Sequence, residues 1–434
     1  MMQFLFTKTP LSYFVASFWR DEAFSYLMAR LPVPSLLWAT AHDANPPLYY
    51  LLLKGWMSIF GSSEVALRSL SLIFFWATLY VSYLIMREVF KLDTKKSIVY
   101  LLIFICNPLL HYYAFEARMY SMMAFLATFL FYALMKKKYK LYAFVALAAL
   151  FTHYFLAIVI FFQCVYLLLT TKRGDLKHFF LPLLKTGVWY IPWIFVLIFA
   201  RPPVGGSFWL PPPTLQDVLL IPAIILTGYE KSAWIVAPFL PLLSLFIIAL
   251  VVGGITRHVA LQKKRQLFLL LGWSCGIPLF IFILSFVKPL FLPRYLIFAT
   301  VGMLLLFIAI LESVKKKLLR YALFTLLILF SLWYTVIQVA MRTKAPLKKT
   351  FSVIQSEMKS DDVIYVTHEY DFHPAEYYLP TKKVYIYKKT YEEIPWFVGK
   401  ILMDKTAFKD RAPLYPARAF IINNDGSYTL QSIQ

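Results

Sequence analysis

Residues 295–312 read YLIFATVGMLLLFIAILE, an apolar run that stops just before the basic cluster at 315–317. Its length is close to the ~20 residues that a helix needs to cross a bilayer. The whole chain is 60% hydrophobic and 15% charged, whereas soluble domains average about 25% charged residues. These figures exclude a soluble single-core enzyme, a disordered regulator and a fibrous protein. Together with this run we expect about ten spans, at 65–90, 97–110, 119–135, 141–152, 154–171, 178–200, 232–254, 266–287, 295–312 and 320–340.

Basic residues outnumber acidic ones by 44 to 22, which gives a formal net charge of +22. They cluster in every second loop between the apolar runs, as basic residues do in cytoplasmic loops. The excess therefore indicates membrane topology, and we expect no nucleic-acid partner. The alternation predicts a multi-pass plasma-membrane protein with its remaining loops outside. The outer segments are 1–64, 111–118, 201–231, 288–294 and 343–434.

The chain is predicted to be mainly α-helical, with two domains. Residues 1–342 form the membrane domain, and 1–64 is its first outer loop. After Arg342 charges become frequent, and short elements follow that predict a small extracytoplasmic α/β domain over 343–434. This domain has no glycine-rich phosphate loop, so we expect it to be accessory. Its expected elements are a helix at 346–358, strands at 362–367, 383–387 and 420–422, and a closing hairpin strand at 427–430.

The first outer loop contains two polar motifs, WRDEAFSY at 19–26 and HDANPPLYY at 42–50. Asn45 is the expected N-cap of an amphipathic interfacial helix, with Pro46 at its first position and Gly61 at its end. Asp43 lies just ahead of this helix, where free backbone N–H groups favour an anion.

Acidic residues are scarce in the membrane half, and several fall at the outer ends of spans. A charge near hydrocarbon costs about 2.5–3.5 kcal/mol, so such residues are usually functional or paired. Asp21, Asp43 and Glu116 can converge to supply a general base or to hold a divalent metal ion. The alternative is ion pairing with an arginine, namely Arg20, Arg30, Arg68 or Arg118, and it weighs more for Glu22 than for Asp21.

The second outer loop reads HYYAFEARMY at 111–120. Glu116 and Tyr120 are four residues apart and would share a helical face. Arg118 can fork toward a phosphate, and Arg294, followed by Tyr295, offers a second cation. His111 is either a phosphate contact or a hydrogen-bonded structural histidine. The proline-rich loop at 201–231 either covers a binding site or is a spacer.

The motifs together resemble the GT-C glycosyltransferases, most closely the bacterial proteins similar to protein O-mannosyltransferases and lipid A aminoarabinose transferases. They are WRDEAFSY, HDANPPLYYLLLKGW, FGSSEVALRSLS and YYAFEARMYS, which are dense over 19–120, and the sparser PRYLIF at 293–298. The resemblance implies transfer of a sugar from a polyprenyl-phosphate carrier to a protein, lipid or glycan. It implies inversion at the sugar carbon, on the extracytoplasmic face of the bacterial inner membrane.

Carried over to this chain, the resemblance makes Asp21 the first-loop acid that serves as base, and Asp43 the acid before the Pro-Pro pair. Glu116 and Arg118 match the Glu-Ala-Arg motif, and Arg294 matches the Arg-Tyr pair. The catalytic set is therefore Asp21, Asp43 and Glu116. The expected substrate-binding residues are Glu22, Asn45, Tyr49, His111, Arg118, Tyr120, Arg294 and Tyr295.

One departure from the family concerns the N-terminus. The family has a membrane helix before the first acidic motif, whereas only twenty residues precede Asp21 here. This predicts that the first family helix is missing, because the chain begins late or is a fragment.

Two other classes of function compete with the transferase. A transporter or flippase for a lipid-linked or anionic substrate also needs many spans, but it favours internal repeats and charges in mid-span. A structural or partner-binding membrane protein would need no convergent carboxylates.

Overall fold

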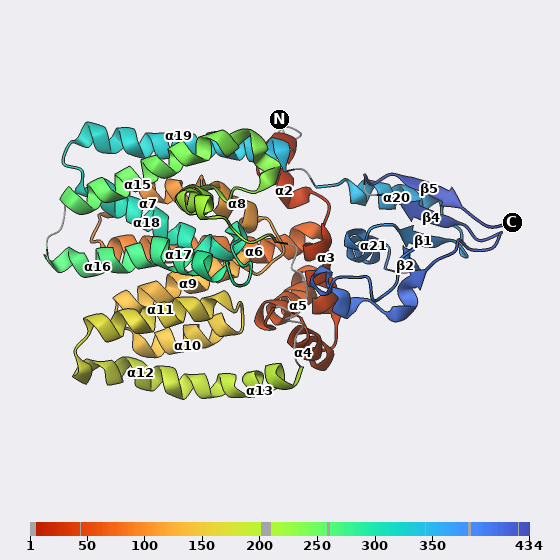
Figure 1. Ribbon diagram of the computed structural model, residues 1–434, viewed down its shortest axis with the longest axis horizontal. Coiled ribbons are helices and arrows are strands. Elements are labelled where there is room, and N and C mark those ends of the chain that lie inside the picture. The colour runs from red at the N-terminus through yellow and green to blue at the C-terminus, as the bar shows by residue number, and fades with distance from the viewer. Residues whose placement is uncertain are drawn as a thin grey trace. The chain divides into compact units, whose positions relative to one another are not determined.

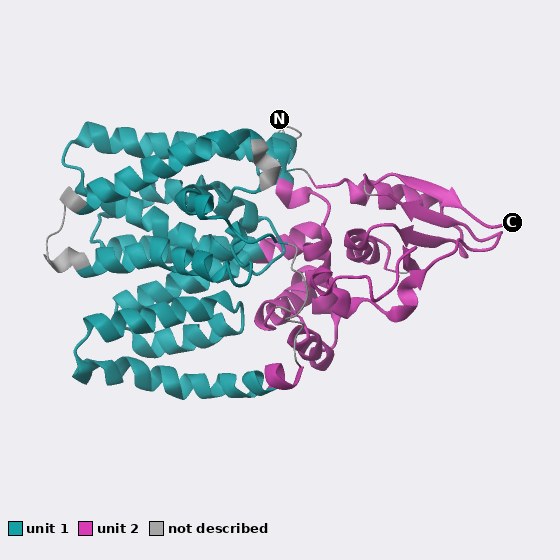
Figure 2. Ribbon diagram, viewed as in Figure 1, with its two compact units in different colours: residues 1–12, 71–195, 206–342 teal, residues 13–70, 196–205, 343–434 magenta. Residues whose placement is uncertain are grey.

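The computed structural model describes residues 6–43, 45–200, 210–257, 261–342, 344–380, 383–423 and 425–434. The chain divides into two compact units (Figures 1 and 2). Unit 1 contains the long helices between residues 71 and 342, and unit 2 joins residues 13–70 to the tail from 343 to 434. Part of the proline-rich loop, at 201–209, lies outside the described residues.

Unit 1 is a bundle of apolar helices around α18 (Ile297–Ser313), the helix that the opening sequence predicts. Within its most apolar window 83% of the residues are buried. Two further helices are shared with unit 2: α6 (Glu64–Leu84) belongs to unit 2 up to Leu70, and α13 (Ile191–Ala200) belongs to it from Val196. The other helices are α7 (Thr94–Ile105), α8 (Pro108–Ala114), α9 (Tyr120–Met135), α10 (Tyr139–Leu150), α11 (Phe155–Thr170), α12 (Arg173–Gly187), α14 (Ile221–Thr227), α15 (Leu240–Arg257), α16 (Leu261–Leu271), α17 (Ile277–Leu284) and α19 (Lys317–Met341).

A close aromatic contact fixes the centre of this bundle. Trp273 lies in a π-helical turn at Gly272–Gly276 and stacks on Phe131 of α9, with ring centroids 3.9 Å apart. Gly302 of α18 faces the same indole, and a Cβ there would lie 2.6 Å from its Cγ atom. A larger residue at 302 would therefore push apart the helices that form the core.

Six helices among the described residues are long and apolar enough to span a membrane. A seventh span results if α7 and α8, which meet at 76°, are counted together. The single run expected at 97–110 is thus broken, because Asn107 caps α8 and Pro108 occupies its first turn. The runs at 119–135, 141–152 and 154–171 form helices of 10–17 residues. The number of ten spans therefore stays a prediction.

Unit 2 begins with four helices, and its tail forms a five-stranded sheet. The early helices are α2 (Leu11–Val15), α3 (Arg20–Arg30), α4 (Val33–Ala41) and α5 (Leu48–Phe60). The tail elements are α20 (Leu347–Glu357), β1 (Val363–Val366), α21 (Phe372–Tyr378), β2 (Val384–Tyr387), β3 (Phe408–Lys409), β4 (Ala419–Ile422) and β5 (Tyr428–Gln431). The α/β tail is thus as predicted, within one or two residues at each expected element.

The strand order is β3-β2-β1-β4-β5. The first four strands are parallel, and β5 runs antiparallel to β4 in the expected hairpin. Ile364 pairs with Val384 on one side and with Phe420 on the other. All three side chains are buried with Phe351 of α20, so the core of the tail lies between this helix and the sheet.

The predicted helix of the first loop is present as α5 and ends at Gly61, which has a φ of +80°. Its expected start is wrong by two residues, because Pro47 and not Asn45 is the N-cap. Asn45 instead donates a hydrogen bond from Nδ2 to the Asp43 carboxylate, at 3.3 Å.

Candidate active site

Asp21 lies in the first turn of α3, where the helix dipole favours a negative charge. Its Oδ1 atom accepts a 2.9 Å hydrogen bond from Nε of Arg20, and its side chain is 14% exposed. The Arg20 guanidinium also lies 4.6 Å from the ring centre of Tyr370, just after β1. The tail thus helps to orient the cation that holds Asp21. A partly exposed, oriented carboxylate is the form that a general base requires.

Glu22, the next residue, is fully buried in an ion-pair cluster. Both of its carboxylate oxygens lie 2.7 Å from the guanidinium of Arg68, and Nζ of Lys344 lies 2.6 Å away. Burial alone would raise the pKa of Glu22, but the two cations and their hydrogen bonds lower it to about 2. Glu22 therefore forms the ion pair with Arg68 that was the alternative to a substrate contact.

Arg68 ties this cluster to the chain that precedes α3. Its guanidinium donates to the carbonyls of Phe14 and Ala16 at 3.0 and 2.6 Å, and to that of Ser17 at 3.3 Å. With the two bonds to Glu22, all five of its N–H groups are used. One buried arginine therefore fixes the segment that leads into α3, and with it the position of Asp21.

Asp43 and Tyr49 lie in the second motif of unit 2. Asp43 is 8% exposed and accepts the bond from Asn45. Tyr49 is buried and packs edge-on against Tyr50, whose ring in turn meets Phe24 of α3 with centroids 6.2 Å apart. These rings pack α5 against the helix that carries Asp21.

Glu116 and Arg118 lie in the turn between α8 and α9 of unit 1. They are 1% and 6% exposed. The Arg118 N–H donates to the Glu116 carbonyl at 2.7 Å, and Ser71 donates its hydroxyl to the Arg118 carbonyl at 3.2 Å. The expectation that Glu116 and Tyr120 share a helical face is wrong, because α9 begins only at Tyr120.

A cluster of ring side chains, Tyr120, His153 and Tyr295, lies beside this turn. The Arg118 guanidinium is 6.0 Å from the Tyr120 ring, and Tyr120 and Tyr295 are 6.3 Å apart between centroids. His153 lies 5.5 Å from Tyr295 and 6.3 Å from Tyr120. Unit 1 therefore brings Arg118, Tyr120 and Tyr295 together. Arg294 is the residue before Tyr295, in the turn Pro293–Leu296 that leads into α18.

His111 lies on α8 in an apolar setting. Its ring stacks on Phe75 at 6.3 Å with an angle of 11° and lies 5.6 Å from Phe115. This position favours the structural alternative more than a phosphate contact.

Unit 1 also contains a partly buried ion pair that the sequence did not predict. Nη2 of Arg342 lies 2.8 Å from the Glu230 carboxylate, and its guanidinium covers the Tyr112 ring at 3.6 Å. Glu230 is an acid at the edge of a long apolar stretch, so the rule that flagged Asp21 also applies to it. Tyr112 belongs to the same motif as Glu116, so the contact between Arg342 and the Tyr112 ring helps to hold this motif in place.

Among the residues that the structure describes, no group of three or more His, Cys, Asp or Glu side chains is arranged to hold a metal ion.

Comparison with known proteins gives a match in fold. No protein-family model and no curated protein sequence matches the chain. The crystal structure of ArnT from Cupriavidus metallidurans in the apo state superposes with a TM-score of 0.52 at 11% identity, over 95% of this chain and 91% of ArnT. The structure of the same protein bound to undecaprenyl phosphate gives the same TM-score and identity over 95% and 90%. The resemblance to the lipid A aminoarabinose transferases is thus confirmed at the level of the fold.

Proposed function

We propose that this protein is an integral-membrane glycosyltransferase that takes a sugar from a polyprenyl-phosphate carrier. The acceptor is a protein, lipid or glycan on the extracytoplasmic face of the inner membrane. The observation that carries the proposal is the ArnT-like fold over 95% of the chain, since an ArnT structure with this fold holds undecaprenyl phosphate. The motifs in the first two outer loops support it, because their acids and arginines are those that this chemistry needs.

The proposed reaction is a single displacement with inversion. Asp21 accepts the proton of the acceptor hydroxyl or amine as that atom forms a bond to the sugar carbon. The bond between this carbon and the carrier phosphate breaks, and the lipid phosphate leaves with its electrons. Because the leaving group is a stable phosphate anion, no strong general acid is required.

Negative charge grows on the leaving phosphate, so cations there stabilise the transition state more than the ground state. We assign this role to Arg118 and Arg294, with Tyr120 and Tyr295 nearby and His111 on the preceding helix α8. Asp43, with Asn45 and Tyr49, and Glu116 are assigned to acceptor positioning or to a second proton acceptor. The ion pairs of Glu22 favour a positioning role over the substrate contact expected from the sequence.

The proposal is tested by purifying the full chain, reconstituting it in vesicles and supplying polyprenyl-phosphate donors with different sugars. A transferase releases free polyprenyl phosphate and yields a glycosylated acceptor. A transporter or flippase instead moves the donor across the bilayer with its sugar bond intact. Donor movement without release of lipid phosphate from any donor would contradict the proposal.

The proposed topology predicts that Gln434 is extracytoplasmic. A reporter enzyme that works only in the cytoplasm, fused after Gln434, should be inactive, while one that needs the periplasm should be active. The opposite result would place the tail, and the acidic loops proposed for the same face, on the side away from the acceptor.

The two arginines should not tolerate replacement by lysine. Arg118→Lys and Arg294→Lys keep the charge but lose the planar fork that can bind two phosphate oxygens. We expect each variant to lower turnover by about 10-fold or more, since one hydrogen bond to a charged group contributes ~1.5–3 kcal/mol. Turnover and donor affinity are measured separately. The control is Arg411→Lys, whose side chain is 84% exposed, and full activity of both test variants would make these arginines structural.

A further inference from the structure

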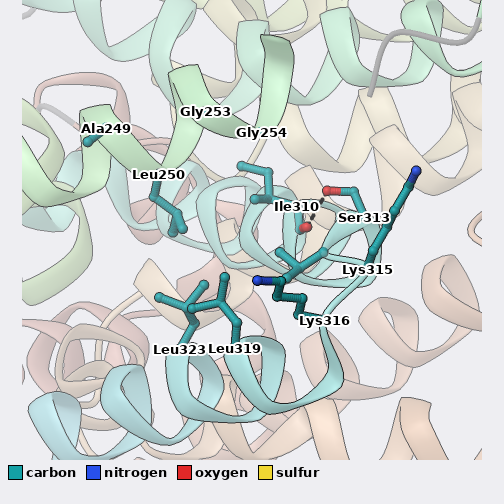
Figure 3. Close-up of a pocket in the computed structure, with 11 residues that line it drawn as sticks. Ala249, Leu250, Gly253, Gly254, Ile310, Ser313, Lys315, Lys316, Leu319 and Leu323 are labelled. Atoms are coloured by element: carbon teal, nitrogen blue, oxygen red, sulfur yellow. Dashed lines mark hydrogen bonds between the residues drawn. The ribbon is translucent and has the colours of Figure 1, made fainter. Parts of the chain in front are cut away.

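A groove of about 660 Å³ opens between three helices of unit 1, α15, α18 and α19 (Figure 3). Its walls are apolar and include Leu250 of α15, Ile310 of α18, and Leu319 and Leu323 of α19. Lys315 and Lys316, in the short connection between α18 and α19, also line it. The volume falls in the range of about 300–1,000 Å³ that is typical of sites for small ligands.

Within unit 1, the groove is separate from Arg294 and Tyr295. It lies at the C-terminal end of α18, whereas Arg294 and Tyr295 lead into the N-terminal end of the same helix. A helix of 17 residues is about 25 Å long at 1.5 Å per residue. A ligand in the groove would therefore be far from the proposed phosphate-binding arginines.

Two adjacent glycines shape the groove. A Cβ on Gly254 would lie 2.7 Å from Cγ1 of Ile310, so this glycine allows α15 to approach α18 closely. A Cβ on Gly253, which also lines the groove, would meet no atom within 4 Å. Glycine at 253 therefore leaves open space, which a larger side chain could fill without a clash at Cβ.

The residues that the structure describes do not neutralise the charge of the two lysines at the groove. In the part of the chain that the structure describes, no ion pair involves Lys315 or Lys316. The neighbouring acid, Glu312, is held by Lys96 and Arg320, each at 3.1 Å, and accepts a 2.6 Å bond from Tyr100. In Figure 3 the ammonium group of Lys316 turns into the space between the helices, while that of Lys315 points outward.

We propose that this groove binds an anionic phospholipid of the surrounding bilayer, with its headgroup on Lys315 and Lys316 and an acyl chain along the apolar walls. All three helices belong to candidate membrane spans, so the molecules that surround them in the membrane are lipids. Basic sites between membrane helices bind acidic headgroups, and each lysine near such a surface contributes about 1 kcal/mol. A groove that combines an apolar wall with an unneutralised cationic rim fits an anionic phospholipid better than a zwitterionic one.

The test measures lipid binding to the purified full chain by native mass spectrometry, with phosphatidylglycerol and phosphatidylcholine as probes. We expect the wild type to prefer phosphatidylglycerol. The variant with Lys315→Gln and Lys316→Gln should lose about 25-fold in affinity for it, or ~5-fold for each lysine. Gly253→Leu should weaken the binding of phosphatidylglycerol by filling the groove while leaving both charges in place.

Two matched controls lie elsewhere in unit 1. Lys172→Gln with Arg173→Gln removes two charges from another basic turn, and Gly187→Leu adds a side chain at another glycine whose Cβ would meet nothing within 4 Å. Both should bind phosphatidylglycerol as the wild type does.

Equal binding by the wild type and both groove variants, or equal loss in the controls, would overturn the proposal. So would displacement of the lipid by inorganic phosphate, or stronger binding of polyprenyl phosphate than of phosphatidylglycerol. Because no sugar transfer is measured, the result is independent of the proposed activity.

Discussion

Asp21→Asn is expected to lower sugar transfer by about 10²–10⁴-fold, the usual cost of removing a general base. Asparagine has nearly the same shape as aspartate, and its side-chain oxygen can still accept the bond from Nε of Arg20. Helix α3 and the contact between Arg20 and Tyr370 should therefore persist. What the variant loses is the ability to take the proton from the acceptor.

The measurement needs three readouts from membranes that contain the variant: protein abundance, donor binding and turnover. The control is Asp361→Asn, the same chemical change at an exposed position of the tail, which should behave as the wild type in all three. Normal binding with strongly reduced turnover supports the role of Asp21. Normal turnover would move the role of base to Asp43 or Glu116, and loss of abundance would make Asp21 a structural residue.

The elements best predicted from the sequence are those whose signal is local. The run at 295–312 became α18 at Ile297–Ser313, because about eighteen apolar residues followed by three lysines leave few alternatives in a membrane protein. Four of the five strands of the tail were predicted for the same reason, since each is a short β-branched or aromatic run between turn residues. Strand β3 (Phe408–Lys409), with only two residues, was not predicted. The parallel pairing of the strands was not predicted, because it joins strands that are far apart in the chain.

The error at Asn45 has a specific physical cause. The same pattern, asparagine followed by proline, does start a helix at Asn107, whose side chain accepts a bond from the Leu110 N–H at 3.0 Å. At Asn45 two prolines follow instead of one, and a residue before proline is disfavoured in the helical region. Pro46 is therefore held outside the helix, which begins after Pro47, and the Asn45 amide turns to Asp43.

The ion-pair cluster shows the limit of reading a site from one sequence. Arg68 was recognised as a possible partner of Glu22, but Lys344 was not, since 322 residues separate it from Glu22. Local spacing carries no information about such a contact. Inside unit 2 the cluster joins the first loop to the tail. Lys344 of the tail therefore contributes to the position of α3.

This cluster leads to the second large expected effect. Glu22→Gln removes the negative charge but leaves Arg68 and Lys344 buried beside a neutral amide. Breaking a buried ion pair by removing one partner typically costs about 3–5 kcal/mol, because the remaining charges are no longer compensated. We expect a correspondingly lower midpoint of thermal unfolding for the purified full chain. The control is Lys348→Gln, which breaks a pair with Glu64 in which the lysine is 59% exposed, and which should cost less than about 1 kcal/mol.

The effect of Glu22→Gln should also depend on pH, with a definite sign. The pKa of Glu22 in the folded protein is about 2, below its ordinary value of 4.5, so folding favours the charged form. This stabilisation is complete above about pH 4.5 and is lost as the pH falls toward 2. The unfolding midpoints of the wild type and of Glu22→Gln should therefore differ most near pH 6 and approach each other as the pH falls from about 5 toward 2. A difference that stays constant over this interval would show that the carboxylate acts through its shape and hydrogen bonds and not through its charge.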